Sequence, residues 1–298
     1  MAIDTNSFAA DNRDLSMFPG EYGYPFFGKT IEFVKDTLAV CADHYERFGP
    51  VSRLDMVKNQ RVLMCLGPEF NEAALFDPHG NFSAAGGYMG SLGGLDPDGM
   101  LLRDGKKHKK TRRASQPAFK TDALRTYVDM LNPIQSRRID ELKPDEEFIF
   151  YDNIQQTLMD VAAKVFIGLD ETSAEAKMLH KIFENINKGL ITPVPYDLPF
   201  STFRKALKSR ESLRNFLVTK IPERRGTELE DMFSRYCNAK DEDENYLEDV
   251  DIDGHIAFLL FAAFDTTTSA LTNILYYLGK NPEWQEKVRD EINNVSSD

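Results

Sequence analysis

The feature that most restricts the fold of this chain is an apolar stretch at residues 250–282, VDIDGHIAFLLFAAFDTTTSALTNILYYLGKNP. Asp251 or Asp253 can cap the start of a helix here, because a carboxylate accepts hydrogen bonds from the free amides of a first turn. Gly279, followed by a proline, can end it. The helix predicted over about residues 252–279 is roughly 40 Å long. It is apolar nearly all round, which predicts a buried central helix.

A polar run interrupts this helix at its middle, where the sequence from Asp265 to Ser269 reads DTTTS. A carboxylate and hydroxyls are costly inside a buried helix unless they are bonded or used chemically. Just before the run lie Ala262 and Ala263, whose small side chains would let a flat group approach the backbone. Two explanations stay open. Either the hydroxyls bond to carbonyls one turn back and the carboxylate meets an arginine, or the run handles protons beside a large cofactor.

A second distinctive segment, LLRDGKKHKKTRRASQPAF at residues 101–119, is strongly basic. His108 and Arg112 are four residues apart, so they share one face of a helix, and such a pair of donors suits an anion such as a carboxylate. The structural alternative for the rest of the charge run is a solvated helix face. The other basic side chains of the run are Arg103, Lys106, Lys107, Lys109, Lys110 and Arg113.

Overall charge and cysteine content exclude several classes of protein. Lys and Arg number 36 against 48 Asp and Glu, a net charge of −12, which argues against nucleic acid as a partner. The three cysteines, Cys41, Cys65 and Cys237, form no C-x-x-C pair, which argues against a zinc site and indicates a reducing, cytoplasmic setting. The longest apolar run, at 256–264, is too short to span a bilayer, so we expect no membrane anchor.

The positions of glycine and proline and the spacing of apolar residues predict a mainly α class with a small β appendage. Residues 1–18 read as a polar tail, and a small β region at about 50–66 contains two short runs that suggest a hairpin. From residue 106 onward the pattern is almost entirely helical. Gly168 is expected to stop the helix that precedes it.

The basic segment at 101–119 and the polar run in the helix at 250–282, in this order, resemble the cytochrome P-450 family of haem-thiolate monooxygenases, soluble bacterial type. The family's small-small-x-acid-Thr-Thr pattern stands at residues 262–267, and its H/W-x-x-x-R element stands as His108 and Arg112. Softer matches are PG…PFFG near the N-terminus, ERFGPV before the hairpin, and NPEWQEKVRDEI after the central helix. The resemblance implies that residues 19–298 form an incomplete domain, the N-terminal two-thirds of the cytochrome P-450 fold.

The sequence departs from the family pattern at two places. Ala263 replaces the glycine usual at that position of the central helix. The family's Glu-x-x-Arg pair and glycine-flanked cysteine loop, which ligates the haem iron, are not found before residue 298, and Cys237 has no glycine loop around it. We therefore expect no metal-ligating cysteine in this chain. The chain would carry the distal half of the domain, and we expect no activity of these residues alone.

The resemblance implies an oxidoreductase that binds haem and inserts one oxygen atom from dioxygen into an apolar organic substrate. Electrons would come from a ferredoxin- or flavodoxin-type donor. Three hypotheses compete: a truncated or split monooxygenase, a non-catalytic remnant that binds an apolar ligand or a partner, and an unrelated α-helical binding module.

The resemblance also implies a role for each candidate residue. Asp265 would relay protons from solvent, and the Thr266 hydroxyl would direct them to the bound dioxygen. The acid followed at once by hydroxyls supports this independently, since packing does not require it. Haem contacts would come from His108, Arg112, Ala262 and Ala263. The redox-partner surface would comprise Lys106, Lys107, Lys109, Lys110 and Arg113.

Overall fold

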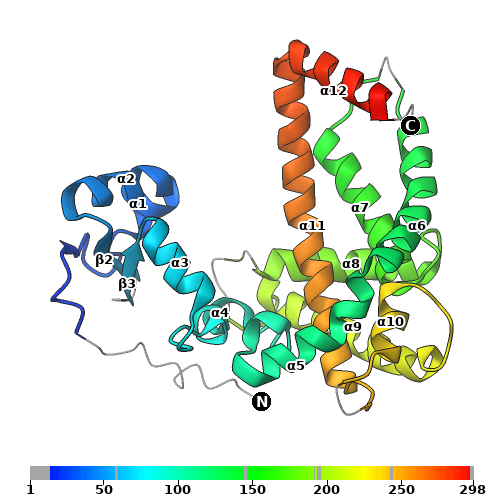
Figure 1. The fold of residues 1–298 in the computed structure, drawn as a ribbon, viewed down its shortest axis with the longest axis horizontal. Coiled ribbons are helices and arrows are strands. Elements are labelled where there is room, and N and C mark those ends of the chain that lie inside the picture. Colours follow the sequence, from blue (N-terminus) through cyan, green and yellow to red (C-terminus); the bar gives the residue numbers. More distant parts are fainter. Residues whose placement is uncertain are drawn as a thin grey trace. The chain divides into compact units, whose positions relative to one another are not determined.

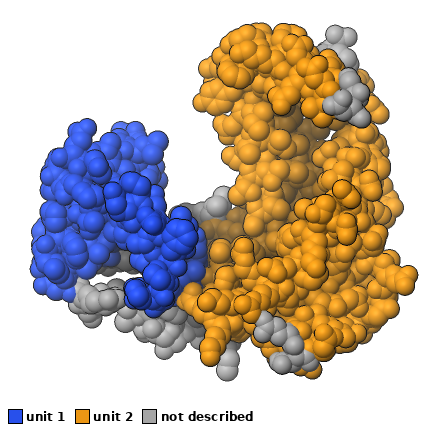
Figure 2. Space-filling model, in the orientation of Figure 1, with its two compact units in different colours: residues 1–90 blue, residues 91–298 orange. Residues whose placement is uncertain are grey.

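The computed structural model describes residues 14–57, 60–143, 146–190, 192, 196–241 and 244–295. The chain forms two compact units (Figure 2), which are described separately: unit 1, Met1–Gly90, and unit 2, Ser91–Asp298. Most of the predicted tail at 1–18 lies outside the described residues.

Unit 1 is built around a three-stranded sheet of order β1-β2-β3. The predicted hairpin is confirmed, since β2 and β3 pair antiparallel with Val51 opposite Cys65, and the short β1 pairs parallel to β2. Four of the six residues of β2 are buried, as suits the central strand. The strands are β1 Gly20–Glu21, β2 Val51–Met56 and β3 Gln60–Cys65. The helices that begin in this unit are α1 Thr30–Lys35, α2 Thr37–Phe48, α3 Pro68–Phe76 and α4 Ala84–Leu92.

Unit 2 is helical throughout its described regular structure (Figure 1). The mainly α class with a small sheet is therefore confirmed. Gly168 ends α7 in the left-handed conformation with φ 72°, where a side chain would be strained. The helices are α5 Gly105–Ser115, α6 Thr121–Asp140, α7 Phe150–Ile167, α8 Ala174–Leu190, α9 Thr202–Arg224, α10 Met232–Asn238, α11 Asp249–Lys280 and α12 Pro282–Val295.

The core of unit 2 lies where α8 packs along α9 and where α11 contacts α7 and α9. Its side chains are aliphatic and aromatic residues spaced at helical intervals, as the hydrophobic effect requires of helices that share a core. The largest fully buried members include Ile186, Leu213, Leu217, Phe233, Tyr236, Ile252 and Ile256.

The long helix α11 spans 32 residues and differs from its prediction in two ways. It begins at Asp249, and neither Asp251 nor Asp253 caps it, because both carboxylates pair with arginines instead. Burial holds only for its first half: Leu260 is 3% exposed, whereas Tyr277 is 61% exposed. The second half runs beyond α8, α9 and α10 to α12 (Figure 1), so these helices cannot cover it.

By length and composition alone, α11 is apolar enough to cross a bilayer, with a mean hydropathy of 1.3 in its best window. The core helix of a soluble protein meets the same criteria, and the first half of α11 packs inside unit 2. This one helix therefore carries no argument for a membrane location.

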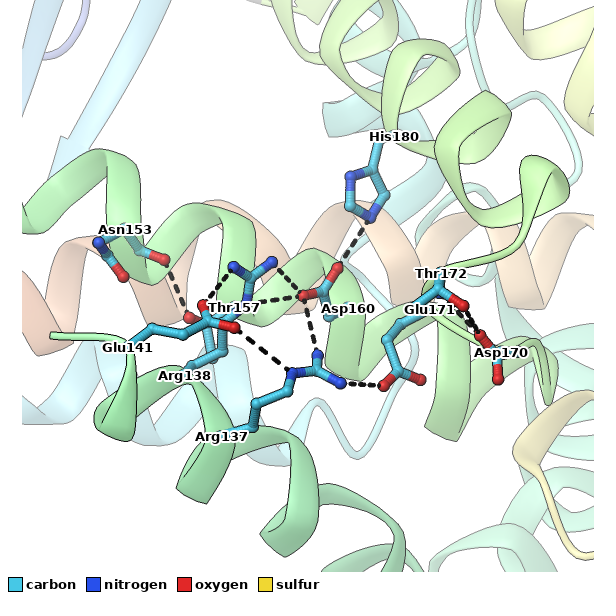
Figure 3. Close-up of polar contacts among 10 residues, drawn as sticks. All are labelled: Arg137, Arg138, Glu141, Asn153, Thr157, Asp160, Asp170, Glu171, Thr172 and His180. Atoms are coloured by element: carbon cyan, nitrogen blue, oxygen red, sulfur yellow. Dashed lines mark hydrogen bonds and ion pairs between the residues drawn. The ribbon is translucent and has the colours of Figure 1, made fainter.

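A network of charges ties α6, α7 and α8 together (Figure 3). Asp160 of α7 is buried and accepts a hydrogen bond from the Nε of Arg138 at 2.9 Å. Its other oxygen lies 3.6 Å from Nε2 of His180, and Arg137 donates to Glu171 at 2.6 Å. Burial lowers the pKa of His180 even though Asp160 opposes that shift. The arginines and carboxylates of the network pair with one another, so the network stabilises the packing of these helices.

Candidate functional site

Helix α5 presents two contrasting faces. Thr111, Ala114 and Ser115 are buried and anchor one face. At the edge of this face, His108 is partly buried and Arg112 is exposed, and within the described residues neither side chain has a hydrogen-bond or ion-pair partner. A guanidinium beside an imidazole, both unpaired and one turn apart, is a donor set for an anion. The structure thus brings the predicted pair together on one helix.

The basic side chains beside this pair are all exposed, as a solvated face would be. Lys110 is nevertheless engaged, since its Nζ lies 2.9 Å from Oδ2 of Asp241. The surface predicted to receive a redox partner is therefore not uniformly available. The remaining exposed lysines on the helix are Lys106, Lys107 and Lys109.

In the middle of α11, the hydroxyls of the polar run bond to the helix backbone. Thr266 donates from Oγ1 to the carbonyl of Ala262 at 2.6 Å, and Thr268 donates likewise to Phe264 at 2.9 Å. This agrees with the structural explanation for the hydroxyls. Asp265 does not meet an arginine within the described part of the chain, and partial burial raises its pKa. The structural explanation therefore accounts for the hydroxyls of Thr266 and Thr268 but not for the carboxylate of Asp265.

The two small residues of α11 point to different surroundings. Ala262 is exposed, whereas Ala263 lines an apolar cavity of about 120 Å³ between α7, α8 and α11, together with Phe183 and Thr267. This cavity is small beside the several hundred Å³ typical of sites for organic ligands. Of the two alanines, Ala262 is therefore the one that opens the helix backbone to a neighbouring group.

His255 shows where α5 and α11 approach one another. Its side chain is fully buried, neither ring nitrogen has a partner among the described residues, and His108 and Arg103 act on it electrostatically. Burial, reinforced by Arg103, lowers its pKa to about 4, so the ring is neutral at pH 7. A lone histidine within an apolar helical run was the sequence signal for it, and our sequence reasoning did not use that signal.

Helical geometry relates this point to the polar run. Ala262 and Thr266 lie seven and eleven positions after His255, close to two and three full turns, so the three share one face of α11. They lie about 10 Å and about 16 Å farther along the axis. Asp265 flanks that face. A ligand that joined an anion held by α5 to Thr266 would have to extend along α11 over this distance.

Burial acts on two of the three cysteines, Cys237 and Cys65. Cys237 is fully buried in α10, and burial raises its pKa to about 12, so its thiol stays protonated. Burial also raises the pKa of Cys65 in β3. Because the thiolate is the metal ligand, neither residue is prepared for that role.

Comparison with known proteins establishes the family. The model of the cytochrome P450 family matches residues 18–298. The chain belongs to the cytochrome P450 family. The hypothesis of an unrelated helical binding module is therefore wrong.

Individual relatives agree with this assignment. The chain is 30% identical over 281 residues to cytochrome P450 136 of Mycobacterium tuberculosis, covering 91% of this chain and 56% of that protein. It is 26% identical over 286 residues to the taxoid 14-beta-hydroxylase of Taxus cuspidata, covering 92% and 55% respectively. The chain thus spans little more than half the length of these relatives.

A solved structure shares the fold. Retinoic acid bound cyanobacterial CYP120A1 superimposes with a TM-score of 0.77 at 24% sequence identity, covering 93% of this chain and 63% of that one. The fold is therefore the mainly α cytochrome P450 fold.

Proposed function

We propose that the protein to which these residues belong is a haem-dependent monooxygenase that inserts one oxygen atom from dioxygen into an apolar organic substrate. The observation that carries the proposal is the unpaired donor pair His108 and Arg112, of which His108 acts electrostatically on His255 of α11. Family membership supports it, because haem is the cofactor that the family implies.

The residues present fit a haem. His108 and Arg112 would donate to its carboxylates, where charge-assisted hydrogen bonds are strongest. Ala262, with only a methyl group, would let the flat ring approach α11. When bound, the haem supplies the iron chemistry that activates dioxygen.

Proton handling would fall to Asp265 and Thr266. Partial burial raises the pKa of Asp265, and no arginine among the described residues holds its carboxylate charged, so it can exchange a proton with solvent. The Thr266 hydroxyl directs its hydrogen to the Ala262 carbonyl, which leaves its oxygen lone pairs to accept a hydrogen bond from a group on the open face. In this proposal the carboxylate exchanges protons with solvent and the oriented hydroxyl holds the group that receives them.

The substrate class is proposed to be apolar. The names of two similar proteins, a taxoid hydroxylase and a protein with bound retinoic acid, are consistent with apolar ligands. A cytoplasmic location is proposed with it, since all three cysteines are free.

A second proposal concerns these 298 residues alone. We propose that they bind haem without a cysteine thiolate and therefore do not catalyse oxygen insertion by themselves, and the protonated, buried Cys237 supports this. The alternative role for such a chain is to bind an apolar ligand or a partner without catalysis. The carbon monoxide difference spectrum of the reduced, haem-supplemented protein should lack a thiolate-type Soret band. A strong band of that type would contradict the proposal, and Cys41→Ser, Cys65→Ser and Cys237→Ser variants would then identify the ligand.

The exposed basic face of α5 is proposed to dock an acidic electron donor of ferredoxin or flavodoxin type. Lys107→Glu and Lys109→Glu should each weaken binding of an acidic ferredoxin to the chain several-fold, and binding should weaken as salt is raised, because both effects act through exposed charges. Isothermal titration at several ionic strengths measures this. Lys188→Glu reverses an exposed charge on α8 and is the control. Equal effects of all three substitutions, or affinity indifferent to salt, would refute the docking surface.

A further inference from the structure

Arg103 immediately precedes α5 and its cap, and its side chain is buried. Its guanidinium contacts three separate segments of unit 2. Nε and Nη2 donate to the carbonyl of Asp98 at 3.0 and 2.6 Å, and Nη1 donates to Oγ1 of Thr111 at 3.1 Å. Nη2 also lies 2.7 Å from Oδ1 of Asp251. One side chain thus joins the preceding loop, α5 and α11.

These contacts reach the two helices close to the candidate site. Thr111 is three residues after His108 and one before Arg112, and its hydroxyl donates to the carbonyl of Lys107 at 2.8 Å. On α11, Asp251 lies one turn before His255, the residue on which His108 acts electrostatically. Arg103 therefore bridges α5 and α11 at the level where they approach one another.

The loop that Arg103 holds is itself fixed on α11. A Cβ at Gly254 would lie only 2.6 Å from the Asp98 carbonyl, so that carbonyl rests directly on the helix backbone. Arg210 of α9 also ties this loop to α11. It donates to both carboxylate oxygens of Asp253 at 2.9 Å and to Asp96 at 3.3 Å. The carbonyl that Arg103 grips is therefore held in place by a second ion cluster.

We propose that Arg103 is a positioning residue: it sets where His108 and Arg112 lie relative to Ala262 and Thr266 by tying α5 to the first turns of α11. The proposal rests on the proposed haem site, but Arg103 is outside the H-x-x-x-R element. Its role requires an arginine, because a planar guanidinium offers five N–H donors in several directions, whereas lysine offers a single nitrogen.

The test compares Arg103→Lys with Arg224→Lys in the full chain. Arg224 is a matched control, since it also joins a carboxylate, a hydroxyl and a backbone carbonyl, those of Asp231, Ser234 and Ile167, but at the end of α9. Arg103→Lys should speed amide hydrogen exchange across residues 105–115 about tenfold and weaken haemin binding by a similar factor. Arg224→Lys should leave both unchanged, although both substitutions remove a guanidinium that joins three groups.

Thr111→Val provides a second variant that removes one acceptor of Arg103 without burying a new charge. It should speed exchange in α5 and weaken haemin binding in the same direction as Arg103→Lys, by a smaller factor. If Arg103→Lys and Thr111→Val leave exchange in α5 unchanged, or if Arg224→Lys speeds it equally, the positioning role is wrong.

The two proposals can fail separately. Exchange in α5 is measured without haem, so it decides whether Arg103 positions the helix. The variant His108→Ala/Arg112→Ala decides whether the helix grips haem. Unchanged haemin affinity in that variant would overturn the haem site, and faster exchange in Arg103→Lys would still support the tie between α5 and α11.

Discussion

Replacing Asp253 by alanine is expected to lower the free energy of unfolding by about 3–5 kcal/mol, the range for removing one partner of a buried ion pair. Asp253 is fully buried, and Arg210, which donates two hydrogen bonds to it, is 8% exposed. Without Asp253, the guanidinium keeps, among the described residues, only Asp96 at 3.3 Å, a carboxyl whose pKa burial raises to about 6 despite the arginine. The loss therefore comes from a buried charge left poorly compensated.

Urea denaturation followed by circular dichroism measures this effect. Asp249→Ala is the control. Asp249 lies in the first turn of α11 and also pairs with an arginine, Arg225, but its side chain is 46% exposed. Exposed pairs contribute at most about 1 kcal/mol. If the two variants lose similar stability, the Arg210 cluster does not hold α11 in unit 2 as described.

Removing the relay groups is expected to have the largest effect on catalysis. In the protein that unites these residues with an iron-ligating cysteine, Asp265→Asn should lower turnover roughly a hundredfold or more, as expected for a displaced acid–base group. Thr266→Ala should keep substrate binding while electrons drain to peroxide rather than to product. Helix α11 should still form in both variants, because Asp265 has no arginine partner among the described residues and alanine is the better helix former.

Neighbouring threonines separate a catalytic role from a structural one. Thr272 lies six positions after Thr266, and its hydroxyl likewise bonds to the carbonyl one turn back. Thr272→Ala should therefore leave the coupling of electrons to product unchanged. Thr266→Ser keeps a hydroxyl at the site and should restore coupling. If Thr266→Ala retains full turnover and full coupling, the polar run is only a set of backbone hydrogen bonds.

Local patterns in the sequence predicted the features that local physics decides. The hairpin, the stop at Gly168 and the shared face of His108 and Arg112 all depend on spacings of a few residues. The i−4 bonding of the hydroxyls was one of two explanations that the sequence left open. The caps proposed for α11 were wrong because Asp253 pairs with Arg210, 43 positions away, and no local signal reports such a partner.

Burial was predicted less well than secondary structure. Apolar composition all round α11 indicated a buried helix, but burial depends on which helices reach it, and Leu260 and Tyr277 differ although both belong to the same apolar run. Arg103 was counted within a solvated charge run, because only the folded chain brings Asp98, Thr111 and Asp251 around it.

The central claim is that α5 grips the carboxylates of a haem that lies along α11, and titration with two porphyrins tests it most directly. Haemin carries free carboxylates, whereas its dimethyl ester does not. The chain should bind haemin at least about tenfold more tightly than the ester, as expected for one or two charge-assisted hydrogen bonds, and the variant His108→Ala/Arg112→Ala should bind both equally. Equal affinity of the unaltered chain for the two porphyrins, or a preference for haemin that survives in the variant, would contradict the claim.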